Sequence, residues 1–357
     1  MPFSPRIAFC CAALAVVFAL GASPALAQVD QDRIFLREGA PKAGVLLKAT
    51  PTVVTMNAGT VQTDIPVNDI RTITFGADTT DTKKLRTTAT EGRYEEVVSM
   101  FEKNEVDLSA IKSPQLIEDM TFYIAYSMGQ LALRGEYDKA KAGGALGIFI
   151  KKYPASWHYF AAVSLMADLA VSAGSYDGAA AYYKTIIDTA PWDDIKMQAH
   201  VGAAKAALAK ADYPTAQSHY NEVMKKSPET DEEMAQQMYA KVGLAVCQAH
   251  ANNGAQADAG IAAINDIIAK NDPKDMELFG RAYNALGDCH LAKGETEDAL
   301  LAYLHTHILF YANPDVHAES LYNIINLWDK LQKPDRAQEA RTLLRARYKG
   351  TRWATKS

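Results

Sequence analysis

The chain repeats one short phrase seven times, and this repeat restricts its fold more than any other feature. Most copies begin with Gly, place Tyr or a polar residue two positions later, and end with Val or Ala after three more. Spacings of 43, 39, 37, 43, 40 and 38 separate the closing residues Val97, Ala140, Ala179, Ala216, Ala259, Ala299 and Ala337. A period of about 40 residues is typical of stacked units that cannot bury their apolar faces alone.

From about residue 81, Ala, Leu, Glu, Lys and Tyr recur at helical spacing, and the phrase resembles the tetratricopeptide repeat (TPR) over most of residues 81–350. In that family the Gly turns the chain from helix A to helix B, and the small residue lets the two helices approach closely. A larger residue four positions later fills the gap to the next hairpin. The resemblance implies a mostly α protein, a TPR-like α-solenoid of about seven helical hairpins. The larger residues here are Phe101, Tyr183, Tyr220 and Tyr303.

Residues 28–80 alternate in the manner of short β-strands, with β-branched residues between Gly, Pro and Asn. The expected strands cover 33–37, 44–48, 52–56, 61–65 and 70–75. Their runs resemble Sm-like or SH3-like barrels, so we expect a small β-barrel domain ahead of the solenoid and an α+β protein overall. The segment has five basic and six acidic residues. We therefore favour a capping or docking role over RNA binding.

Residues 1–27 have the pattern of a secretory signal peptide. Arg6 precedes an uncharged apolar run from Ile7 to Leu20, and Ala25-Leu26-Ala27 supplies small residues before Gln28. The run is shorter than the ~20 residues that span a bilayer. We expect cleavage between Ala27 and Gln28, export to the periplasm or the extracellular space, and no stable membrane span.

Charge and motifs exclude several functions. The chain has 37 Lys and Arg against 42 Asp and Glu, a net charge of −5, which argues against a nucleic-acid partner. His305 and His307 are two residues apart on a helix and point to different faces, which disfavours zinc. Cys247 and Cys289 are expected as buried free thiols. We expect no enzyme activity, no cofactor and no metal.

A binding surface follows from the repeat register. Positions 11, 15 and 18 residues before each closing small residue share one stripe of helix A, which the TPR resemblance places on the concave face. This stripe predicts a polar groove with one aromatic anchor, formed by Lys241, Arg281, Asn284, Asp288, Tyr322 and Asn326. The same stripe includes Asp168, Lys205 and Glu319. The alternative is that these residues are ordinary solvated surface.

The function expected from this pattern is a non-catalytic scaffold or adaptor of the bacterial cell envelope that binds proteins or peptides. Tyr153-Pro154-Ala155-Ser156 resembles junctions of exported bacterial repeat proteins, such as accessory proteins of the Tol–Pal system and of outer-membrane assembly. One alternative is a solenoid that binds glycan or cell wall, which exposed aromatic residues on the concave face would favour. Another is an enzyme, which a deep pocket with strongly shifted ionisable groups would favour.

The C-terminal end is basic. Residues 340–357 contain no acid and six basic residues, which are Arg341, Arg345, Arg347, Lys349, Arg352 and Lys356. These charges complement the negative end of the last helix. A basic tail over 351–357 that contacts an anionic surface is the alternative.

Overall fold

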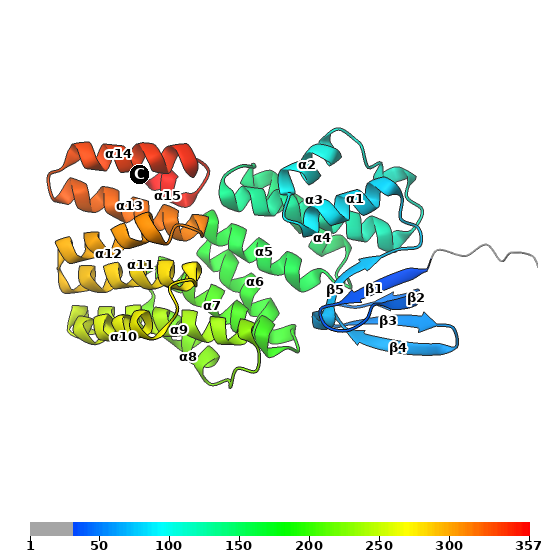
Figure 1. The fold of residues 1–357 in the computed structure, drawn as a ribbon, viewed down its shortest axis with the longest axis horizontal. Helices are drawn as coiled ribbons and strands as arrows, with labels where there is room; N and C mark the ends of the chain where they lie inside the picture. Colours follow the sequence, from blue (N-terminus) through cyan, green and yellow to red (C-terminus); the bar gives the residue numbers. More distant parts are fainter. Residues whose placement is uncertain (1–30) are drawn as a thin grey trace, which may run out of the picture.

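The computed structural model describes residues 31–357 and places a five-stranded sheet beside a curved stack of helices (Figure 1). The strands are β1 (Asp32–Leu36), β2 (Lys42–Ala49), β3 (Val53–Ala58), β4 (Val61–Pro66) and β5 (Ile70–Thr74). Each expected strand is present, within two residues of its expected bounds. The expected signal peptide and its cleavage site lie outside the described residues.

The strands form an antiparallel sheet in the order β4-β3-β2-β1-β5. Register shifts at Phe35/Leu36 and Leu46/Lys48 bend it, as β-bulges do. Within residues 31–357 the hydrogen-bonded ladder ends at β4 and β5, which the 3-10 turn η1 (Val67–Asp69) joins. The expected barrel is therefore present only as a bent sheet whose two edge strands do not pair.

Seven helical hairpins follow the sheet, as the repeat predicts. Their helices are α1 (Thr80–Thr90) with α2 (Tyr94–Glu102), α3 (Pro114–Arg134) with α4 (Lys139–Lys152), α5 (Tyr159–Ser172) with α6 (Tyr176–Thr189), α7 (Asp193–Ala209) with α8 (Tyr213–Met224), α9 (Asp231–His250) with α10 (Ala257–Lys270), α11 (Met276–Lys293) with α12 (Thr296–Leu309), and α13 (Pro314–Lys330) with α14 (Pro334–Arg347). Short 3-10 turns η2 (Leu108–Ala110) and η3 (Ala251–Gly254) lie between helices. Among residues 31–357, no helix combines enough length and apolarity to cross a membrane.

Every hairpin turn has a residue in the left-handed backbone region shortly before the B helix begins, and in the fifth turn Asn252 and Asn253 also take this conformation. Five of the seven are glycines, with φ between 77° and 88°, and these are Gly92, Gly135, Gly174, Gly254 and Gly294. Ala211 and Gln332 take the same position in the fourth and seventh hairpins, with φ of 57° and 58°. Because a Cβ atom strains this conformation, Gly is the favoured residue there. This requirement explains why most copies of the phrase begin with Gly.

The buried small residue at each A–B contact is the fourth residue of the B helix. These residues are Val97, Ala142, Ala179, Ala216, Gly260, Ala299 and Ala337. The repeat phrase placed this contact at Ala140 in the second hairpin and at Ala259 in the fifth, and both are exposed. After their turn glycines, α4 and α10 begin two residues and one residue later than the other B helices, which shifts the register.

Three of the four expected gap-filling residues are buried. Each tyrosine ring lies where a glycine on an A helix leaves room, and the pairs are Tyr183 with Gly202, Tyr220 with Gly243, and Tyr303 with Gly287. The fourth expectation is wrong because Phe101 is 38% exposed, whereas its neighbours Val98 and Met100 are buried. Cys247 and Cys289 are buried free thiols, as expected.

The revised register predicts which alanines tolerate a larger side chain. We expect Ala142→Leu to lower the free energy of unfolding by about 1–3 kcal/mol, because Ala142 is fully buried where α3 and α4 meet. The exposed Ala140→Leu should change it by less than about 0.5 kcal/mol. Ala216→Leu, at the same position of α8, serves as the positive control. Urea denaturation measures the free energy of unfolding of all three variants. Equal losses of stability in Ala140→Leu and Ala142→Leu would contradict the revised register.

The sheet shares one hydrophobic core with the first hairpins. Ile34 and Ile73 of the sheet and Leu85, Leu116 and Met120 of α1 and α3 are fully buried in the same cluster. Such continuous apolar packing stabilises the position of one element against the other. The sheet therefore covers the N-terminal end of the helical stack.

A buried ion network also joins α1 to α3 and to the segment that links β5 to α1. Arg86 of α1 is 3% exposed and donates to both oxygens of Asp78, at 2.8 and 2.9 Å, and to Asp119 Oδ2 of α3, at 2.7 Å. Burial alone would lower the pKa of Arg86, but Asp119 and Asp78 hold it above its ordinary value. Burial lowers the pKa of His158, which lies 2.8 Å from Asp119 Oδ1. Arg86 thus carries the charge, and His158 donates as a neutral imidazole.

The stack of hairpins curves until its C-terminal end meets the second hairpin. Gly135 at the end of α3 lies against Gly350, and a Cβ atom added to Gly135 would be 2.6 Å from the Gly350 nitrogen. The chain then ends in a short helix, α15 (Arg352–Lys356), which contacts α13, where the sequence suggested a tail. α13 also contacts α3. The second to seventh hairpins thus form a closed ring.

Candidate functional site

The inner face of this ring encloses two adjoining cavities of about 370 and 320 Å³, which we call the chamber. Helices α5, α7, α9, α11 and α13 supply most of its wall, and α15 contributes from the chain end. The residues that line both cavities are Lys205, Tyr239, Arg281, Asp315 and Arg352. Ring closure therefore brings the last hairpin and the third into one site.

One wall of the chamber is cationic. Arg281 and Lys205 both lie over the Tyr239 ring, 4.7 and 5.8 Å from its centroid. Arg281 also donates to Glu277 Oε1, one turn earlier on α11. Lys205 has no ion-pair partner within residues 31–357, and burial, followed by Arg281, lowers its pKa to about 7. This wall can accept a carboxylate or another anion.

Another part of the wall is acidic. Asp288 and Glu319 line the first cavity together with the buried Asn284. Tyr303 donates its hydroxyl hydrogen to Asp288 Oδ1 at 2.5 Å, and Asn284 Nδ2 donates to Glu319 Oε2 at 3.1 Å. Burial and the neighbouring Glu319 raise the pKa of Asp288 to about 7. The same desolvation raises the pKa of Glu319. Neither carboxylate forms an ion pair in the described part of the chain.

The charge pattern follows one position of the repeat. Asp288 lies fifteen residues before its tyrosine partner, and Asp168 lies fifteen before Tyr183, whose hydroxyl donates to it at 2.6 Å. In the fourth hairpin, the first of the two that lie between them, this position holds Lys205, fifteen residues before Tyr220. A single change of residue type at one repeat position therefore places a lysine between two acids in the chamber.

Three of the six predicted groove residues line the chamber. Arg281, Asn284 and Asp288 come from α11, where the repeat phrase had the correct register. Asp168, Lys205 and Glu319, which lie on the same stripe, also line it. The likeness of these positions across repeats explains why the stripe could be found without the structure.

The other three predicted residues do not line the chamber. Lys241 is exposed because the anchor of the fifth hairpin is Gly260, which moves Val242 to the chamber wall and Lys241 to the outside. Tyr322 packs against Trp353 of α15, with ring centroids 5.4 Å apart, and Asn326 is exposed. Near its C-terminal end, α13 turns these positions away from the chamber.

Sequence reasoning missed several charged or aromatic wall residues. Glu277 lies one helical turn before the predicted stripe, and Tyr239 lies one turn before Val242 once the register of the fifth hairpin is corrected. Asp315 and Arg352 reach the chamber only through ring closure. Arg352 Nη2 lies 3.8 Å from Asp315 Oδ2, and no repeat spacing points to this pair.

Three aromatic rings of the wall, those of Tyr239, Tyr213 and Trp353, each have another side chain over one face. Tyr239 lies beneath Arg281 and Lys205, Tyr213 stacks on His250 with ring centroids 4.4 Å apart, and Arg352 lies 4.3 Å above Trp353. A sugar ring needs an open aromatic face for stacking. This arrangement disfavours the glycan-binding alternative.

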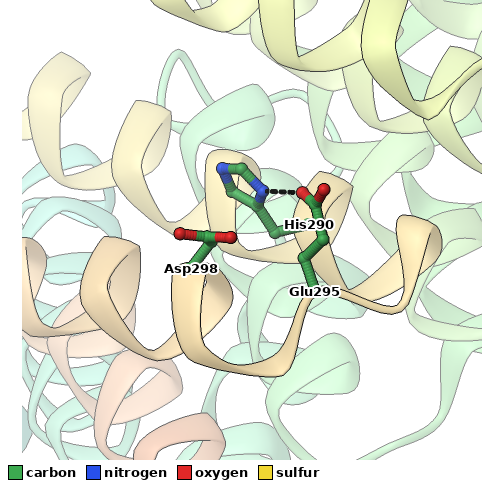
Figure 2. Close-up of side chains that lie close together, drawn as sticks. All are labelled: His290, Glu295 and Asp298. Atoms are coloured by element: carbon green, nitrogen blue, oxygen red, sulfur yellow. Dashed lines mark hydrogen bonds and ion pairs between the residues drawn. The ribbon is translucent and has the colours of Figure 1, made fainter.

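A second cluster of polar groups lies at the turn between α11 and α12. Figure 2 shows His290, Glu295 and Asp298, whose ligand atoms lie within 4.8 Å of one another. His290 Nδ1 lies 2.7 Å from Glu295 Oε2, and Lys293 Nζ lies 2.5 Å from the other oxygen of Glu295. Lys293 also pairs with Asp258 at 2.8 Å. Because both Glu295 oxygens are occupied, we interpret the cluster as an ion network that stabilises the turn.

Comparison with known proteins identifies the fold. No family model and no curated protein matches the chain. It is similar to the crystal structure of a tetratricopeptide repeat protein from Parabacteroides merdae, with a TM-score of 0.52 and 11% identity over 75% of this chain and 94% of that one. The apo form of RapI aligns with a TM-score of 0.43 and 11% identity, over 78% of this chain and 76% of that one. The apo form of the quorum sensor NprR from B. thuringiensis aligns with a TM-score of 0.39 and 11% identity, over 74% of each chain. The chain is therefore a TPR-like α-solenoid preceded by a small antiparallel sheet.

Proposed function

We propose that this chain is a non-catalytic scaffold of the bacterial cell envelope, which binds a polypeptide segment in the chamber of its ring. The observation that carries the proposal is the polarity of the wall. Five carboxamides line it beside groups of both charges, and these are Gln198, Gln236, Asn284, Asn313 and Asn323. Carboxamides both donate and accept hydrogen bonds, as a peptide backbone requires of its partner.

The size of the chamber restricts the bound species. A cavity of about 370 Å³ lies near the lower end of the ~300–1,000 Å³ range of ligand sites. Interfaces between folded domains bury ~1,200–2,000 Å² and need a much larger surface. A few residues of extended chain fit this space, whereas a folded domain does not. The envelope location rests on the secretory pattern of residues 1–27.

Photo-crosslinking tests the proposal. A photoreactive residue at Gln236, inside the chamber, should crosslink a polypeptide in cells that express the full chain. The same residue at Lys241 or Asn326, which are exposed, provides the matched control. Crosslinks from the two exposed positions but none from Gln236 would move the binding surface to the outside of the ring.

Arg281→Ala should weaken capture of that polypeptide by about 2 kcal/mol or more, because Arg in an enclosed site often dominates binding energy. Asn326→Ala should leave capture unchanged, because Asn326 is exposed outside the chamber and does not support its wall. Competition binding with the purified variants measures both effects. The melting temperature of each variant distinguishes lost binding from lost folding.

A second candidate function is catalysis, favoured by two groups with a pKa of about 7 in one enclosed site. A neutral Lys205 amine could act as a nucleophile or base. However, no hydrogen-bonding side chain positions Lys205 among the described residues, and Tyr303 already engages Asp288. We therefore rank catalysis second, and turnover of a captured peptide by the purified protein would support it.

A further inference from the structure

The amide oxygen of Asn284 is a buried acceptor without a donor. Asn284 is 4% exposed, and its Nδ2 donates to the Val316 carbonyl at 2.9 Å and to Glu319 Oε2 at 3.1 Å. Two acceptors on one side fix the orientation of the amide. Its Oδ1 has no partner within residues 31–357. Since buried acceptors are almost always satisfied, this oxygen indicates a donor that arrives with a ligand.

Two further acceptors belong to the same cavity wall. Asp288 Oδ1 is occupied by Tyr303, and Glu319 Oε2 is occupied by Asn284. The second oxygen of each carboxylate has no hydrogen bond from the described part of the chain. Burial and mutual repulsion raise the pKa of Asp288, as expected for carboxylates that lack a cation. Arg281 and Arg352 act on Glu319 without pairing with it.

We propose that Asn284, Asp288 and Glu319 form a subsite for a primary ammonium group, carried by a lysine side chain or a free N-terminus. A primary ammonium has three N–H donors, which matches the three unpartnered oxygens. It also carries a positive charge, and the two half-buried carboxylates have no cation partner among the described residues. The inference rests on the proposed function, because it names the chemistry of the polypeptide that enters the chamber.

The position of the subsite on α11 suggests how the polypeptide lies. Arg281 of the cationic wall precedes Asp288 by seven residues, which is about 10 Å along a helix. A ligand with an ammonium at Asp288 therefore extends towards Arg281 and Lys205. Backbone groups or an acidic side chain then meet the cationic wall, and Asn284 of α11 lies between the two charged ends.

Matched peptides on the full-length protein test the ammonium preference. The first pair is Gly-Gly-Gly-amide and acetyl-Gly-Gly-Gly-amide, which differ in the N-terminal ammonium. The second pair is acetyl-Gly-Lys-Gly-amide and the same peptide with an acetylated lysine. Calorimetric titration near pH 7 should show about tenfold or tighter binding of the charged member in at least one pair, since hydrogen bonds to charged groups contribute this much. The pair that responds identifies the source of the ammonium.

Conservative variants locate the effect. Asp288→Asn keeps an acceptor for Tyr303, and Glu319→Gln keeps one for Asn284. Each should remove about tenfold in affinity for the charged peptide and leave its acetylated partner unaffected. Asp266→Asn changes an acid of α10 that pairs with Lys270 outside the chamber, and it is the control, for which we expect little change.

Several outcomes would overturn the inference. Equal binding of charged and acetylated peptides leaves the chamber a peptide site but removes the ammonium subsite. Displacement of the charged peptide by CaCl₂ in the parent but not in Asp288→Asn identifies a divalent-cation site instead. Failure of both the peptides and ethylammonium chloride to bind also overturns it. Binding of ethylammonium alone, lost in Asp288→Asn, supports the subsite even if no polypeptide is captured, so the two proposals fail separately.

Discussion

Replacing Asp119 by Ala should lower the free energy of unfolding by about 3–5 kcal/mol, the cost of removing one partner from a buried ion network. The substitution leaves Arg86, which is 3% exposed, with Asp78 alone, and it leaves the buried His158 without its acceptor. Urea denaturation followed by circular dichroism measures the loss. Because this network joins α1, α3 and the segment after β5, the first hairpins and the sheet that shares their core should unfold at lower urea than the remaining hairpins.

Two controls separate the buried network from charge in general. Arg93→Ala removes an exposed arginine that pairs with Glu91 and Glu96, and it should change stability little. Arg86→Met combined with Asp119→Leu removes both charges, and it should cost less than the sum of the two single changes. An Asp119→Ala variant as stable as the parent would contradict this account of the junction.

Acidification should destabilise the parent more than a His200→Gln, His317→Gln double variant, by about 2 kcal/mol for each imidazole at pH 5. Burial and the neighbouring His219 lower the pKa of His200 to about 4. Burial and the neighbouring His307 likewise lower the pKa of His317 to about 4. The unfolded chain therefore binds these protons first. The stability contribution is present above pH ~6.5 and is lost as the pH falls towards 4.

The difference between parent and double variant is the quantity to measure. Asp168, Asp288 and Glu319 have a raised pKa and act in the opposite sense, because the folded protein takes up their protons first as the pH falls. They are present in both proteins and cancel in the difference. Urea titrations at pH 7.5, 6 and 5 give the two profiles, and parallel profiles would show that neither imidazole is buried as a neutral group.

The hairpins could be predicted because each turn requires a residue with a left-handed backbone conformation, and at most turns the sequence has Gly there. Gly92, Gly174 and Gly294 mark turns after which the B helix begins two residues later. The phrase failed where that interval changes, at Gly135 and Gly254, because a local insertion leaves the phrase intact while it rotates the helix. Local chemistry thus predicts that a hairpin exists better than it predicts which face is buried.

The candidate site was half predictable for a related reason. Arg281, Asn284 and Asp288 follow from a correct register on α11. Asp315 and Arg352 reach the chamber because the ring closes between segments more than two hundred residues apart in the chain. No short-range pattern carries that contact. The TPR resemblance predicted that the stack has a concave face. It did not predict how strongly the stack curves, and the curvature determines which residues line the chamber.

The contact between Gly135 and Gly350 alters how the array of hairpins loses its structure. In an open array the terminal repeats have a single neighbour, so unfolding starts there and proceeds inward. Here the last hairpin is supported on both sides, by the sixth hairpin and by α3. Unfolding of any one hairpin of the ring must therefore separate it from a neighbour on each side at the same time. A protein built this way resists fraying at its C-terminal end, and it loses that resistance as soon as a side chain larger than glycine separates the two backbones.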